Sequence, residues 1–172
     1  LMDRASLHAV ENLDGMPAIV KTLPEIAAAL LIEFQEDSFD KLEERVQQFL
    51  ASSSQIALIN TPVFTTDPKE QDFFWKVRKG LFPAVGAVRA SGTTVILEDV
   101  AFPVEQLGNA ILELQELFRK YGYHNAIIFG HAKDGNIHFV VTQSLNTDEE
   151  VTRYDQFMRE VVTLVVEKYN GA

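Results

Sequence analysis

The stretch IIFGHAKDGNIHFVV, residues 127 to 141, constrains the fold of this chain most, because it predicts a tight β-hairpin. Two apolar runs flank the dipeptide Asp134-Gly135, and Asp-Gly favours a two-residue turn of the primed type, in which both central residues take positive φ. Counting outward from this turn pairs Lys133 with Asn136, Ala132 with Ile137, and His131 with His138. We therefore expect Ile137 and Phe139 to point toward a layer of helices, and the two histidines to point the other way.

The expected register gives His131 and His138 a shared face of the hairpin. Directly opposed residues have Cβ atoms roughly 4.5 to 5.5 Å apart, so their imidazoles can coordinate one divalent cation. The alternative is a polar cross-strand pair at a sheet surface that binds nothing. A catalytic metal also needs a third protein ligand and an open coordination position. The acidic candidates for that ligand are Glu33, Glu98 and Asp99.

The remaining periodicity predicts an α+β fold. Strands are expected at 27–34, 55–60 and 93–102, besides the two strands of the hairpin. Helices are expected at 38–50, from Asp67-Pro68 until Pro83 and Gly86, from Pro103 to 118, and after a capping box of Thr147 and Glu150. This order favours an antiparallel or mixed sheet with helices on one face, built as two ferredoxin-like halves.

Composition narrows the classes of partner. The 172 residues are 47% hydrophobic and 23% charged, as in ordinary globular domains. A formal charge of -10 argues against binding to nucleic acid. The absence of cysteine excludes disulfides, thiolate metal sites and a cysteine nucleophile in this chain. No apolar run is long enough for a transmembrane segment, and no signal-peptide pattern opens the chain. We expect a cytoplasmic location, with peripheral association with the inner membrane left open.

Two arginines are candidates for binding an anion. Trp75 and Arg78 stand one helical turn apart, so the guanidinium can bind a carboxylate beside the indole. The alternative is an amphipathic helix in which the indole packs and the guanidinium is solvated. Arg89, in a glycine-containing irregular stretch, is either a second anion contact or an ordinary loop arginine. No glycine-rich dinucleotide fingerprint, P-loop or nucleophile elbow is present in the sequence.

The adjacent acids Glu98 and Asp99 are unusual inside an expected strand, because one of them must face inward. They indicate either a buried acid paired with a cation, or an edge strand where both side chains reach water.

The segment GHAKDGNIHF resembles the GHxGDGNxH signature of the FAD-linked oxidase C-terminal domain, found in flavin-dependent D-2-hydroxyacid dehydrogenases. LMDRASL, FWKVRKGLFPAVGA and LEDVAFPVEQL agree with the family in the same order, so the resemblance covers nearly all of residues 1–172. Lys133, where the family often has glycine, resembles the branch in which the flavin enzyme is fused to an iron-sulfur region.

The resemblance implies a cap, or substrate, domain that covers the ring of an FAD bound by an N-terminal domain of the same polypeptide. It implies that His131 and His138 ligate a divalent metal, often zinc, and that Arg78 contacts the carboxylate of a small 2-hydroxyacid. Such enzymes oxidise substrates of the D-lactate or D-2-hydroxyglutarate class to the 2-oxoacid, passing a hydride from the α-carbon to the flavin. The metal would polarise the substrate hydroxyl.

The chain also departs from the family pattern. The family's third metal ligand and catalytic histidine lie in an EHG segment after the last helix, so we expect this chain to be an excised piece that by itself binds no FAD and is inactive. Relatives specific for 2-hydroxyglutarate have threonine, lysine and asparagine where Phe82, Leu97 and Val140 stand here, which puts those substrate contacts in doubt. The competing hypothesis is a non-catalytic ferredoxin-like binding module whose hairpin histidines are structural.

Overall fold

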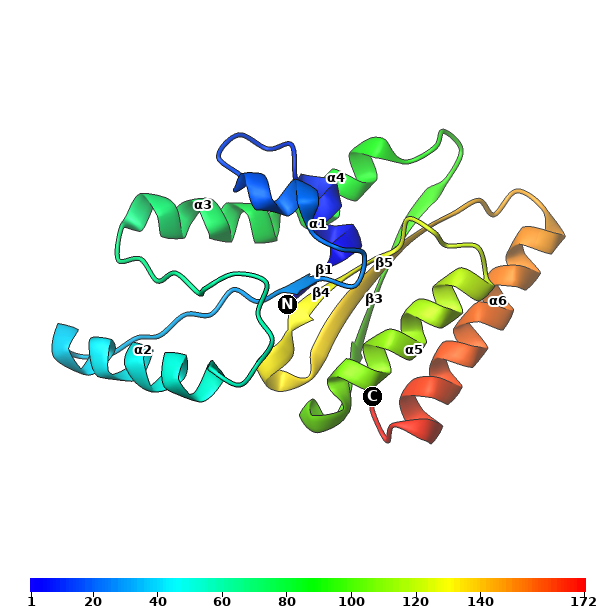
Figure 1. Cartoon of the computed structure of the whole chain (residues 1–172). Helices are drawn as coiled ribbons and strands as arrows, with labels where there is room; N and C mark the ends of the chain where they lie inside the picture. Colours follow the sequence, from blue (N-terminus) through cyan, green and yellow to red (C-terminus); the bar gives the residue numbers. More distant parts are fainter. The chain divides into compact units, whose positions relative to one another are not determined.

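The computed structural model describes residues 1–84 and 89–172 in full, together with the helical assignment of residues 85–88. The chain forms two compact units (Figure 1). The larger unit contains Leu1–Leu30 and Val77–Ala172, and the smaller contains Leu31–Lys76. Among the helices described, none is both long and apolar enough to cross a membrane.

The larger unit contains a five-stranded antiparallel sheet with the order β2-β1-β4-β5-β3. Its strands are β1 (Met2–Asp3), β2 (Ala28–Ala29), β3 (Thr94–Ala101), β4 (Ile127–His131) and β5 (Asn136–Gln143). The three long strands match the expected positions in the C-terminal half of the sequence. The α+β class and the antiparallel sheet are therefore confirmed.

The main core lies between this sheet and the helices α5 (Leu107–Lys120) and α6 (Asp148–Val162), which run side by side (Figure 1). A π-helical turn, η4 (Thr163–Lys168), continues α6. Ile137 and Phe139 of β5 are fully buried in this core, as the hairpin alternation predicts. The centre is aromatic: the Phe157 ring lies 4.8 Å from Tyr123 and 6.1 Å from Phe139, between ring centroids. Burial of each such side chain contributes about 1.5–3 kcal/mol.

The predicted start of α6 is confirmed by a complete capping box. The Thr147 hydroxyl accepts from the Glu150 amide at 3.2 Å, and the Glu150 carboxylate accepts from the Thr147 amide at 3.1 Å. Helix α5 begins at Leu107, after a short 3-10 turn, η2 (Val104–Gln106), that follows Pro103. The helix predicted after Pro103 is therefore present, with Leu114 and Phe118 in the core.

Short helices precede the hairpin in the larger unit. Helix α1 (Arg4–Val10) follows β1 directly, because Asp3 caps it by accepting from the Ser6 amide at 2.8 Å. The Ser6 hydroxyl donates to the Ile128 carbonyl at 2.8 Å and so fixes α1 to β4. Helix α1 also contacts α4 (Leu81–Val88), and a 3-10 segment, η1 (Ala18–Thr22), leads to β2.

The smaller unit contains α2 (Phe39–Ser53) and most of α3 (Pro68–Lys79). Helix α2 confirms the amphipathic helix expected at 38–50. Its Phe49 packs in a cluster with Phe34 and Phe64, with ring centroids 5.8 to 5.9 Å apart. Asp67 caps α3 as predicted, accepting from the Lys69 amide at 2.9 Å.

Two expected strands do not form as predicted. The run at 27–34 contributes only Ala28–Ala29 to the sheet, where these two residues pair with Asp3 and Met2 of β1. The run at 55–60 is irregular, and its apolar residues Ile56, Leu58 and Ile59 are exposed. The β-α-β unit expected around α2 therefore lacks its second strand, since a short apolar run becomes a strand only where a sheet edge is available.

The helix expected from Asp67 to Pro83 is also divided. It ends at Lys79, and α4 begins at Leu81. Pro83 lies in the first turn of α4, where the missing amide hydrogen costs no intrahelical hydrogen bond. Pro83 is thus part of a new helix, and the break falls before it.

Candidate functional site

The hairpin that carries the two histidines has a longer turn than predicted. Strands β4 and β5 pair His131 with Asn136 and Phe129 with His138, so the register is shifted by two residues and the expected direct pairing is wrong. The turn is a 3-10 segment, η3 (Ala132–Asp134), closed by the Gly135 amide donating to the Ala132 carbonyl at 3.2 Å. Only Gly135 of the two central residues takes positive φ, at 67°, so the primed two-residue turn is not formed.

The shift leaves both histidines on the same face, because side chains alternate with a period of two and a two-residue shift preserves their direction. His131 and His138 are diagonal neighbours with ring centroids 5.8 Å apart and planes at 82°. His131 is exposed, whereas the His138 side chain is only 20% exposed and packs on the Phe129 ring at 5.3 Å. The predicted sharing of one face is confirmed, through a diagonal contact.

Arg78, from the last turn of α3, reaches this pair. Its Nη2 atom lies 3.0 Å from Nε2 and 3.4 Å from Nδ1 of His131. The structure thus brings an arginine and two histidines together, although Arg78 and His131 are 53 positions apart in the chain.

Trp75, one turn earlier on α3, makes a different contact. Its indole Nε1 donates to Glu33 Oε2 at 3.0 Å within the smaller unit. Trp75 and Arg78 thus contact different partners, and binding of a carboxylate by Arg78 stays a prediction. Glu33, one candidate for a third metal ligand, is the acceptor of this indole.

The two adjacent acids, Glu98 and Asp99, face opposite sides of β3, which is an edge strand of the sheet. Glu98 accepts from the Tyr154 hydroxyl at 3.0 Å, and burial together with this carboxylate raises the pKa of Tyr154. Asp99 stands opposite His138 in the register, with its Oδ2 3.4 Å from His138 Nδ1.

Of the three acids proposed as a third metal ligand, Asp99 is therefore the one that lies next to a histidine. No three histidine or acidic side chains gather into a metal site within the described part of the chain. The residues present fit two imidazole ligands of a metal ion.

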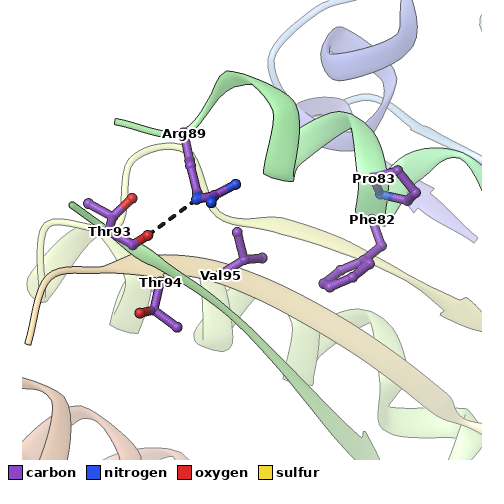
Figure 2. Close-up of a pocket in the computed structure, with 6 residues that line it drawn as sticks. All are labelled: Phe82, Pro83, Arg89, Thr93, Thr94 and Val95. Atoms are coloured by element: carbon purple, nitrogen blue, oxygen red, sulfur yellow. Dashed lines mark hydrogen bonds between the residues drawn. The ribbon is translucent and has the colours of Figure 1, made fainter. Parts of the chain in front are cut away.

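A shallow hollow of about 390 Å³ lies between α4 and the start of β3. Figure 2 shows the residues that line it: Phe82, Pro83, Arg89, Thr93, Thr94 and Val95. The Arg89 Nε atom donates to the Thr93 carbonyl at 3.2 Å, and the end of its guanidinium extends on the side of Phe82 and Pro83 (Figure 2).

The hollow and the histidines share one face of β3. Val95, Leu97 and Asp99 project from the same side by strand alternation, so Leu97 lies between the hollow and the position opposite His138. Leu97 is 42% exposed and stands directly opposite the buried Val140. The face next to His138 therefore presents apolar side chains along β3.

Fold and site together define an α+β domain that presents an imidazole pair and a guanidinium on one sheet face, an arrangement suited to a small anionic ligand with a second polar group. The chain belongs to the family of C-terminal domains of FAD linked oxidases, whose family model matches residues 1–172. The sequence resemblance to this family is thereby confirmed.

Relatives within this family carry the names of 2-hydroxyacid enzymes. The chain is 26% identical to the glycolate oxidase subunit GlcD of Bacillus subtilis, over 84% of this chain and 30% of that protein. It is 26% identical to a probable mitochondrial D-2-hydroxyglutarate dehydrogenase of Oryza sativa subsp. japonica, over 92% of this chain and 27% of that protein. It is 28% identical to a D-lactate dehydrogenase of Anaerostipes hadrus, over 99% of this chain and 34% of that protein. The chain thus spans about a third or less of the length of these relatives.

Proposed function

We propose that this chain is the substrate domain of an FAD-dependent oxidoreductase that oxidises a D-2-hydroxyacid to the 2-oxoacid. Family membership and the names of the relatives support this proposal. The observation that carries it is the cluster of Arg78, His131 and His138, with 3.0 Å between Arg78 Nη2 and His131 Nε2 and 5.8 Å between the two imidazoles.

The cluster matches the chemistry of a 2-hydroxyacid, which carries a carboxylate and a hydroxyl on adjacent carbons. The guanidinium of Arg78 can bind the carboxylate through two parallel N–H groups. His131 and His138 would hold a divalent metal, for which zinc is our expectation, beside the hydroxyl. A metal held by these imidazoles would lower the pKa of that hydroxyl, and a bound flavin would supply the acceptor for the hydride of the α-carbon.

The FAD would be bound mainly by another domain of the same polypeptide. Fusion to an iron-sulfur region remains a prediction based on Lys133 alone. Within the described residues the third metal ligand is missing, so the complete metal site would depend on a further segment.

Of the two substrate classes, we favour the D-lactate class. Leu97 and Val140 form an apolar cross-strand pair on the face next to His138, and Phe82 lines the hollow further along that face. An apolar surface suits a substrate with a small methyl-like side chain and leaves a second carboxylate without a partner there. The D-2-hydroxyglutarate class would instead need Arg89 as a second anion contact.

The proposal is tested with the protein purified at full length. We expect flavin absorbance, and loss of turnover with D-lactate on chelation and in His138→Ala. A protein that is colourless and never reconstitutes with FAD would refute the proposed activity, and a binding module with structural histidines would then be favoured. Turnover unchanged by both chelation and His138→Ala would reject the metal role.

Arg78→Ala tests the carboxylate contact separately. Loss of a hydrogen bond to a charged group costs about 1.5–3 kcal/mol, so KM should rise roughly 10- to 150-fold. Lys79→Ala is the matched control, because it removes a positive charge from the adjacent exposed position of the same helix. An equal change of KM in the two variants would remove Arg78 from the substrate site.

A further inference from the structure

One ring nitrogen of His138 is buried. This atom, Nδ1, makes no hydrogen bond of good geometry within the described part of the chain. Asp99 Oδ2 nevertheless lies 3.4 Å from it, in the position directly opposite across β3 and β5. The two atoms are within ion-pair distance but do not meet the geometry of a hydrogen bond, and the Asp99 side chain that carries the carboxylate is about half exposed.

The second oxygen of Asp99 is already held. Asn136 Nδ2 donates to Asp99 Oδ1, and the same amide lies 3.4 Å from the Val100 carbonyl. Asn136 is the first residue of β5 and stands opposite His131. The amide therefore fixes Asp99 in the orientation that points Oδ2 toward His138.

We infer that Asp99 is a positioning residue that keeps the proton of neutral His138 on Nδ1 and leaves the lone pair of Nε2 for the site. An ionised carboxylate can only accept hydrogen bonds, so the ring nitrogen that faces it must carry the hydrogen. The tautomer of a histidine ligand is generally set by the bond its other nitrogen makes. The use of that lone pair for metal binding rests on the proposed function, whereas the tautomer itself does not.

Asp99→Asn tests this assignment because it keeps the shape of the side chain. The Asn136 amide would still donate to the oxygen of the new side chain, so the new amide group would face His138 Nδ1. Nδ1 would then have to accept, and the proton would move to Nε2. In the protein with ¹⁵N-labelled histidine, at about pH 8.5 where an ordinary imidazole is neutral, we expect the ring nitrogen shifts of His138 to exchange their protonated and unprotonated character.

A double variant should reverse the change. With Asn136→Asp added to Asp99→Asn, the new amide at position 99 donates to the new carboxylate, and its oxygen again faces His138. We expect the Nδ1–H tautomer to return. Metal affinity, measured by chelator competition with zinc, should fall about 10- to 100-fold in Asp99→Asn and recover in the double variant.

Glu98→Gln is the matched control, since it removes the neighbouring carboxylate on the opposite face, where Tyr154 binds it. It should change neither the His138 shifts nor zinc affinity. An Nε2–H tautomer in the unsubstituted protein would overturn the inference, as would unchanged shifts in a folded Asp99→Asn. If the tautomer changes as expected but zinc binds to no variant, the positioning role stands and the proposed metal site fails.

Discussion

Gly135, at the end of the histidine hairpin, cannot accept a side chain without moving β3. A Cβ atom at this position would lie 1.9 Å from the Phe102 carbonyl oxygen, whereas ordinary contacts begin at 3.4 Å. The backbone is also left-handed there, with φ at 67°. In Gly135→Ala the turn and the end of β3 must therefore separate by about 1.5 Å.

The cost has two parts. Left-handed backbone at a residue with a Cβ atom costs about 1–2 kcal/mol. Separation also breaks the hydrogen bond from the Phe102 amide to the Gly135 carbonyl, 2.9 Å in the structure, which is worth about 1 kcal/mol. We expect Gly135→Ala to lower the free energy of unfolding by about 2–3 kcal/mol.

Urea denaturation of a three-glycine series separates these parts. Gly92 has φ of 84° with nothing within 4 Å of its added Cβ, so Gly92→Ala should cost only the backbone term of about 1–2 kcal/mol. Gly108, in α5, has open space and ordinary helical backbone, so Gly108→Ala should stabilise by up to about 0.5–1 kcal/mol. Equal losses for Gly135→Ala and Gly92→Ala would refute the steric argument.

Three further measurements test other parts of the fold. Burial raises the pKa of Asp3, so the contribution of Asp3 to the free energy of unfolding is fully present below its unfolded pKa and is lost as pH rises through the raised pKa. In urea denaturation at a series of pH values, Asp3→Asn should remove this loss of stability above about pH 4; a pH dependence equal to that of the unsubstituted protein would contradict this. Phe157→Ala should cost about 3–5 kcal/mol in urea denaturation, whereas Val162→Ala, at an exposed position of the same helix, should cost far less; similar losses would contradict the assigned core. The hydrogen bond to Glu160 raises the pKa of Tyr121 to about 12, so Glu160→Gln should lower the pKa seen in ultraviolet titration, and an unchanged titration would exclude this bond.

Local signals in the sequence predicted the helices and the faces of the hairpin. The capping box of Thr147 and the apolar spacing through Phe157 act within a few residues, so their consequences are encoded where they occur. The shared face of His131 and His138 was predictable for the same reason, because side chains along a strand alternate with a period of two. The turn differs from the predicted one, but the register shift of two residues leaves both side chains on the same face.

Only the tertiary structure decided which distant segments meet. The runs at 27–34 and 55–60 look like strands, but a strand needs a partner edge, and the first run pairs only through Ala28 and Ala29 with the two residues of β1. The contacts of His131 with Arg78 and of His138 with Asp99 join segments dozens of positions apart. The sequence alone determined the side chains that the hairpin can offer. Long-range strand pairing and packing determined which groups face those side chains. Pairing and packing depend on the free energy of the whole sheet, which no local sequence pattern encodes.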